Sequence, residues 1–144
     1  MMDIHIVVGS VLGASEYVAD ALNEYLSNKG HQCTLHFQPI FTEVDFSKLV
    51  IIITSTHGAG ELPDNIQDFA DELINAQLDN TNYLLIGLGD TSYDTFCNGA
   101  RTIENLMKEA NARLLHPALH IDVLQHPVPE EFALEWFEQI VDKL

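Results

Sequence analysis

The amino-acid sequence predicts a doubly wound α/β fold, in which helices cover both faces of a parallel sheet. Hydrophobic periodicity alternates along the chain between short β-branched runs, which suit buried strands, and apolar stripes, which suit helices packed on one side. One run, Leu49 to Ile53, is uniformly apolar, as a central parallel strand covered on both faces requires. Five such strands with short connections indicate right-handed crossovers and a single domain over residues 1–144.

The first half of the chain predicts two strands around a helix. The run Ile4 to Val8 predicts the first strand, and the alternation from Cys33 to Phe37 predicts the second. Between them, Gly30 suits the residue that follows a helix C-terminus. The apolar stripe of that helix consists of Val18, Leu22, Tyr25 and Leu26. The segment Gln38 to Ser47 is too short and irregular for a full helix, so we expect a loop or one helical turn there.

The second half predicts two more strands and three helices after the central strand. Pro63 fits the first turn of a helix, and Tyr83 to Leu88 predicts the fourth strand. The buried face of that helix should consist of Ile66, Phe69, Ala70, Leu73 and Ile74. A further helical stripe consists of Phe96, Ala100, Ile103, Met107 and Ala110. Leu114 to Val123 predicts the fifth strand, and Pro129 opens a final helix that should end near Leu144.

Composition excludes several classes of protein. The 144 residues carry 6 Lys and Arg against 22 Asp and Glu, a formal charge of −16, which would repel DNA, RNA and anionic membranes. The longest apolar run is far short of a membrane span, and the start of the chain lacks a basic signal region. Cys33 and Cys97 form neither a disulfide framework nor a zinc motif. We therefore expect a cytoplasmic protein without a metal site.

Three loops rich in Gly and hydroxyl residues should meet at one edge of the sheet: residues 9–15, 54–60 and 87–94. In open parallel sheets, ligands bind at the carboxyl ends of the strands where the strand order reverses. The first loop leads into a helix N-terminus, whose free N–H groups attract an anion. Because the loop lacks the lysine of a P-loop, a monoester phosphate suits it best. The alternative is an ordinary turn with Ser15 as the helix N-cap.

Two flat side chains occupy the other two loops. Tyr93 follows a strand in a Gly-Asp-Thr-Ser context that should hold it at the surface, where it could stack on a planar ligand. His57 has a corresponding place and could cover the opposite face of that ligand. Together the loops indicate a site for an aromatic ring system with a phosphorylated tail. The alternatives are that Tyr93 is a surface residue and His57 an ordinary loop histidine.

The three loops, in this order and spacing, resemble those of the flavodoxin family, and the resemblance covers the whole chain. Ser10 to Ser15 resembles the family's phosphate loop, and Gly89 to Cys97 resembles its isoalloxazine loop. Ser55 to Gly58, followed by Pro63 to Asn65, is most similar to the MioC-type short flavodoxins. The resemblance implies the strand order 2-1-3-4-5, FMN as cofactor, and an electron carrier rather than a stand-alone catalyst.

The resemblance also implies which residues hold FMN. Ser10, Gly13 and Ser15, with the amides between them, would hold the phosphate, and Ser55 and Thr56 would assist at the phosphate or ribityl side. The complete set that the resemblance implies is Ser10, Val11, Leu12, Gly13, Ala14, Ser15, Ser55, Thr56, His57, Gly58, Ala59, Leu88, Gly89, Asp90, Tyr93, Phe96 and Cys97.

Around the flavin ring, the resemblance implies stacking by Tyr93 on one face and His57 near the other. Backbone amides around Asp90 and Cys97 would meet the pyrimidine edge of the flavin. The alternative for Cys97 is a redox role of its thiol. The peptide between Gly58 and Ala59 would face N5 and make the flavin a one-electron carrier. Glycine suits that position because a peptide that turns its carbonyl needs φ values closed to most residues.

Two features depart from the family pattern. Val11 and Ala14 replace polar residues of the phosphate loop, so we expect a weaker affinity for FMN. His57 stands where many flavodoxins have tryptophan or tyrosine. Since histidine titrates near neutral pH, we expect His57 to make the flavin potential depend on pH between about 5 and 8.

Acidic residues dominate the stretch from Leu49 to Ala100, which contains no Lys or Arg. Its eight carboxylates are Glu61, Asp64, Asp68, Asp71, Glu72, Asp79, Asp90 and Asp94. Their alternative role is to solvate helix faces. Around a flavin they would steer basic partners by charge and disfavour anionic reduced flavin. The expected partners of this monomer are a basic-faced flavoprotein reductase as donor and, by resemblance, biotin synthase as acceptor.

Three other functions compete with an electron carrier. A signalling receiver domain would need acidic residues where Gly9 to Val11 and Ser55 to His57 stand, and we discard it. An FMN-dependent quinone-type reductase would need a substrate pocket over the flavin, for which the chain has little spare length. A scaffold module that has lost its cofactor would accord with Val11 and Ala14.

Overall fold

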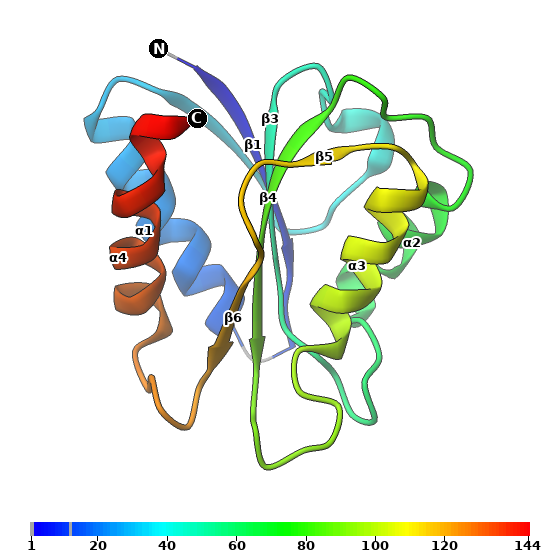
Figure 1. The fold of residues 1–144 in the computed structure, drawn as a ribbon, viewed down its shortest axis with the longest axis vertical. Coiled ribbons are helices and arrows are strands. Elements are labelled where there is room, and N and C mark those ends of the chain that lie inside the picture. The colour runs from blue at the N-terminus through cyan, green and yellow to red at the C-terminus, as the bar shows by residue number, and fades with distance from the viewer. Residues whose placement is uncertain (1, 12) are drawn as a thin grey trace.

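In the computed structural model, which describes residues 2–11 and 13–144, parallel strands form one sheet between two layers of helices (Figure 1). The strands run in the order β2-β1-β3-β4, and β5 and β6 both pair with β4. Their bounds are β1 Asp3–Gly9, β2 Gln32–His36, β3 Leu49–Thr54, β4 Asn82–Gly89, β5 Arg113–Leu114 and β6 Leu119–Asp122. The predicted doubly wound fold and its strand order are confirmed.

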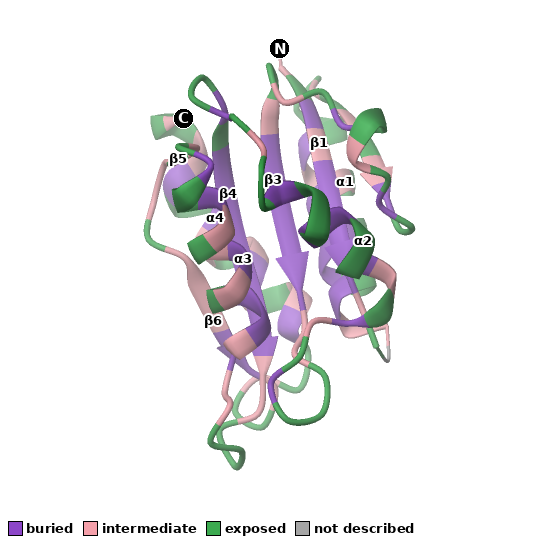
Figure 2. Ribbon diagram, turned by 90° about the vertical axis from the view of Figure 1, so that its right-hand side faces the viewer, coloured by how far each residue is buried: buried purple, intermediate pink, exposed green. Residues whose placement is uncertain are grey.

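In the described part of the chain, four α-helices cover the sheet, two on each face (Figure 1). α1 (Ala14–Asn28) and α4 (Pro129–Ile140) lie on one face, and α2 (Asp64–Leu73) and α3 (Asn98–Glu109) lie on the other. Both faces of β3 are therefore buried, as Figure 2 shows, and this explains its uniformly apolar sequence.

The predicted fifth strand is interrupted. Tyr83 pairs with Leu114, and Ile86 pairs with Leu119. Between these two pairs, β4 advances by three residues and the last segment of the sheet advances by five. Pro117 lies in the extra stretch, where its missing N–H cannot join a ladder. The single strand expected from Leu114 to Val123 is therefore wrong in its middle, and β5 and β6 take its place.

Two predicted helix boundaries also change. The final helix ends at Ile140 and continues only as a 3₁₀ turn, η2 (Val141–Lys143), instead of reaching Leu144. Ile74 was expected on the buried face of α2, but it follows the end of that helix and is 58% exposed. The segment before β3 contains only a 3₁₀ turn, η1 (Phe41–Glu43), as expected.

The end of α1 confirms the predicted role of Gly30. The N–H of Gly30 donates to the carbonyl of Ser27, and the N–H of His31 donates to the carbonyl of Leu26. These two bonds form a Schellman motif with Gly30 at φ +90°. Within the described residues, no helix combines the length and apolarity that crossing a membrane requires.

Candidate functional site

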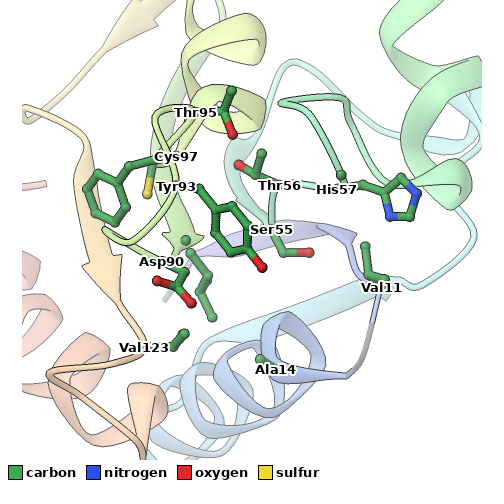
Figure 3. Close-up of a pocket in the computed structure, with 14 residues that line it drawn as sticks. Val11, Ala14, Ser55, Thr56, His57, Asp90, Tyr93, Thr95, Cys97 and Val123 are labelled. Carbon is green, nitrogen blue, oxygen red and sulfur yellow. The ribbon is translucent and has the colours of Figure 1, made fainter.

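A pocket of about 380 Å³ opens at the carboxyl edge of the sheet (Figure 3). Its volume lies within the range of small-molecule sites. The lining residues are Val11, Ala14, Ser55, Thr56, His57, Gly58, Leu88, Gly89, Asp90, Tyr93, Thr95, Phe96, Cys97 and Val123. Segments that follow β1, β3, β4 and β6 therefore share one pocket, because the carboxyl ends of parallel strands lie at the same edge.

The pocket brings together residues from all three predicted loops and omits a few. Ser10, Gly13, Ser15 and Ala59 are not among the residues that line it, and Leu12 lies outside the described residues. Thr95 and Val123 also line it, although neither was predicted. Thr95 belongs to the loop already singled out by its motif, whereas Val123 could have been found from its place at the carboxyl end of the predicted fifth strand.

Hydrogen bonds within the protein shape the first loop. The N–H of Ser10 donates to Asn65 Oδ1 at 2.9 Å, and the N–H of Gly13 donates to Ser10 Oγ at 2.9 Å. Gly13, at φ +91°, is the N-cap of α1, a left-handed conformation that favours glycine. Val11 and Ala14 extend this loop to the pocket wall, where Figure 3 shows them on the α1 side.

Ser15 does not cap α1, contrary to the alternative that the sequence left open. The helix begins at Ala14, so Ser15 is its second residue, and none of the described side chains makes a cap hydrogen bond. Ser15 is fully buried, and its Oγ has no hydrogen-bond partner among the described residues. The first N–H groups of a helix have no acceptors within the helix, and a buried hydroxyl normally has a hydrogen-bond partner. An anion such as a phosphate at the N-terminus of α1 would supply a partner to both.

The second loop forms a tight turn that is fastened to α3. Glu61 and His57 exchange two backbone hydrogen bonds of 2.8 and 2.9 Å. Asn98 Nδ2 donates to the carbonyl of Gly60 at 2.8 Å, and the N–H of Gly99 donates to Thr56 Oγ1 at 3.0 Å. The turn is therefore held against the helix that begins after the third loop.

Gly58 and His57 lie within this turn and are both exposed. Gly58 has φ +51°, a left-handed conformation that favours glycine. Figure 3 shows the His57 ring turned away from Tyr93. Stacking of His57 on a ligand therefore stays a prediction.

The third loop presents Tyr93 across the middle of the pocket (Figure 3). Its side chain is 62% exposed, as expected, and its N–H donates to the carbonyl of Asp90 at 3.1 Å. Thr91 Oγ1 donates to Asp122 Oδ2 at 2.5 Å, which fastens the loop to the end of β6. This hydroxyl holds the pKa of the Asp122 carboxyl below its ordinary value.

Cys97 is the last residue of the third loop and the N-cap residue of α3, where its backbone has φ +53°. Its side chain is fully buried, and burial raises the pKa of its thiol to about 11. A neutral thiol is a poor nucleophile and a poor metal ligand. In the described part of the chain, no cluster of three or more His, Cys, Asp and Glu residues could hold a metal ion.

Comparisons with known proteins agree with this geometry. The Flavodoxin family model matches residues 6–137. A protein named MioC homolog from Haemophilus influenzae is 39% identical over 145 residues, which is 99% of both chains. A cysteine-to-alanine mutant of flavodoxin from Pseudomonas aeruginosa superposes with a TM-score of 0.85 at 34% identity, covering 96% of each chain. A Fusobacterium nucleatum flavodoxin bound to flavin mononucleotide shares the fold, with a TM-score of 0.81 at 15% identity, covering 100% of this chain and 99% of that one.

Proposed function

Because this chain belongs to the flavodoxin family and is similar to MioC proteins, we propose that it binds one FMN in the carboxyl-edge pocket and carries single electrons between redox proteins. One observation carries the proposal. Val11 and Ala14, from the loop that leads into the N-terminus of α1, line the same pocket as the exposed ring of Tyr93. The pocket thus offers a place for a phosphate and a place for a flat ring.

The residues of the pocket would bind and orient the cofactor rather than perform acid or base chemistry. The N-terminus of α1 and the hydroxyls of Ser10 and Ser15 would hold the phosphate. Tyr93 would cover one face of the ring, and the turn around Gly58 would border its N5 edge. When bound, FMN supplies the redox chemistry, since it accepts and releases electrons one at a time. His57 would tune the potential with pH, which a His57→Phe variant tests by its pH profile.

The redox partners follow from charge and from resemblance. We propose a basic-faced flavoprotein reductase as donor, because the carboxylates between Leu49 and Ala100 have no neighbouring Lys or Arg in sequence. The proposed acceptor is biotin synthase, from the resemblance to MioC-type proteins. We also propose that the protein acts in the cytoplasm as a monomer.

Titration of the cofactor-free protein with FMN tests the first step. We expect quenching of FMN fluorescence and a flavin absorbance spectrum that stays with the protein through gel filtration. Absence of binding would overturn the proposal and favour a scaffold module. Anaerobic reduction tests the second step, for which we expect two separate one-electron stages. A single two-electron stage would favour an FMN-dependent quinone-type reductase instead.

A further inference from the structure

The side chain of Asn65, in the first turn of α2, joins three segments that are distant in sequence. Its Oδ1 accepts a hydrogen bond of 2.9 Å from the N–H of Ser10. Its Nδ2 donates to the carbonyls of Val8 and Phe37, at 2.7 and 2.9 Å. Both N–H bonds of the amide group and its oxygen are thus engaged. Two partners are carbonyls and one is an N–H, so only this orientation of the amide satisfies all three.

These bonds place Asn65 at the start of the phosphate loop. The chain of contacts continues from Ser10, whose Oγ accepts the N–H of Gly13, to the N-terminus of α1. The loop itself contains no Lys or Arg, so its affinity for an anion depends on the orientation of its N–H groups and hydroxyls. A residue that fixes where the loop begins therefore controls how well those groups converge on a phosphate.

Resting on the proposed function, we propose that Asn65 is a positioning residue that sets the affinity for the phosphate of FMN without contacting the cofactor. Its amide oxygen and both of its N–H bonds already have partners within the protein, so the side chain is not free to bind the phosphate. It acts through Ser10, and its bonds to Val8 in β1 and to Phe37, the residue after β2, brace the amide from two neighbouring segments. The flavin ring would be held by the other two loops, and the hydrogen bonds of Asn65 go to Val8, Ser10 and Phe37 instead.

Comparison of FMN with riboflavin tests this inference, because riboflavin has the same ring and lacks the phosphate. We expect Asn65→Ala to weaken FMN binding about tenfold, the effect of losing a hydrogen bond to a partly buried group, and to leave riboflavin binding unchanged. Asn65→Asp keeps an acceptor for Ser10 but loses both donors and adds an anion, so the same selective loss is expected. Gln67→Ala is the matched control, since Gln67 is an exposed amide of the same helix whose Nε2 donates to the carbonyl of Leu62, away from the phosphate loop.

Inorganic phosphate gives a second measurement that does not involve flavin. It should raise the melting temperature of the cofactor-free wild type and of Gln67→Ala, since binding to the native state stabilises it, and should raise that of Asn65→Ala less at the same phosphate concentration. Equal losses of FMN and riboflavin affinity, or no loss of either, would overturn the inference and leave the proposed function intact. A wild-type protein that binds neither flavin would overturn both.

Discussion

Tyr93 is an aromatic residue that lines the pocket and is largely exposed. Its side chain is 62% exposed, and the loop that carries it is fastened at both Asp90 and Asp122. We expect Tyr93→Ala to weaken FMN binding about tenfold, because aromatic stacking contributes roughly 1 kcal/mol beyond the area it buries. Fluorescence titration measures the change.

Tyr17 provides the matched control for that variant. It is 65% exposed, lies on α1 and does not line the pocket, so Tyr17→Ala should bind FMN as the wild type does. If both variants lost affinity equally, the loss would reflect general destabilisation, and Tyr93 would have no stacking role.

Cys97 should be a sluggish thiol despite its place in the pocket. Burial raises its pKa to about 11, so the reactive thiolate is scarce at neutral pH and grows about tenfold with each pH unit until the pH reaches that value. A Cys33→Ser variant leaves Cys97 as the only thiol. We expect its alkylation by iodoacetamide, followed by mass spectrometry, to be slow at pH 7 and to rise steeply above pH 9. Rapid labelling at pH 7 would instead support a redox role.

Exposed side chains in glycine-rich loops can be predicted from sequence because local chemistry places them. Tyr93 is such a residue, and its exposure follows from its neighbours alone. The position of Asn65 cannot be predicted this way, since its three hydrogen bonds reach Val8, Ser10 and Phe37 across the sheet edge. The burial of Ser15 likewise depends on how α1 packs against the sheet.

At the scale of whole elements, the start of α3 packs directly against the loop after β3. A Cβ added at Gly99 would lie 2.7 Å from the carbonyl oxygen of Ser55 and 3.2 Å from Thr56 Oγ1. The N–H of Gly99 donates to that same Thr56 hydroxyl. The helix and the loop can therefore keep this distance only with glycine at position 99.

We expect Gly99→Ala to lower the free energy of unfolding by about 1–3 kcal/mol, because the added methyl group must push the backbone of α3 away from the loop. Urea denaturation of the cofactor-free protein measures this change. Asn105→Ala, on the exposed side of the same helix, should change the free energy by less than about 0.5 kcal/mol. Equal stability of the Gly99 variant and the wild type would contradict the close contact.

Periodicity predicts the elements well where a strand or helix has one clear pattern. β3 is uniformly apolar because both of its faces are covered, and the sequence alone was enough to place it at the centre of the sheet. The last strand was mispredicted because apolar residues continue through Pro117, although a proline interrupts the ladder there. Hydrophobic pattern reports burial, whereas strand continuity also needs an N–H at every bonding position.

For the molecule as a whole, positive charge is distributed unevenly between the two edges of the sheet. Helices here run opposite to the strands, so helix C-termini lie at the edge far from the pocket (Figure 1). Five of the six Lys and Arg residues lie at or near that far edge, at the ends of helices or the starts of strands. They are Lys29, Lys48, Lys108, Arg113 and Lys143. Arg101, in the first turn of α3, is the exception.

This asymmetry should orient the protein so that its pocket edge meets a basic partner first. We expect the second-order rate of electron transfer from a flavoprotein reductase to fall markedly between about 0.01 and 1 M ionic strength, as the screening length shortens from about 30 Å to about 3 Å. Stopped-flow measurement of flavin reduction gives this rate.

Two variants of equal charge separate docking from net charge. Asp94→Asn, in the exposed loop beside Tyr93, should slow transfer at low salt and flatten its salt dependence. Asp142→Asn, in η2 at the far edge, removes the same charge and should leave the rate near that of the wild type. Net charge alone would slow both variants equally, and a rate that stayed constant across the salt range would rule out docking by charge. The position of a carboxylate relative to the pocket, rather than the total of −16, is what should govern the rate.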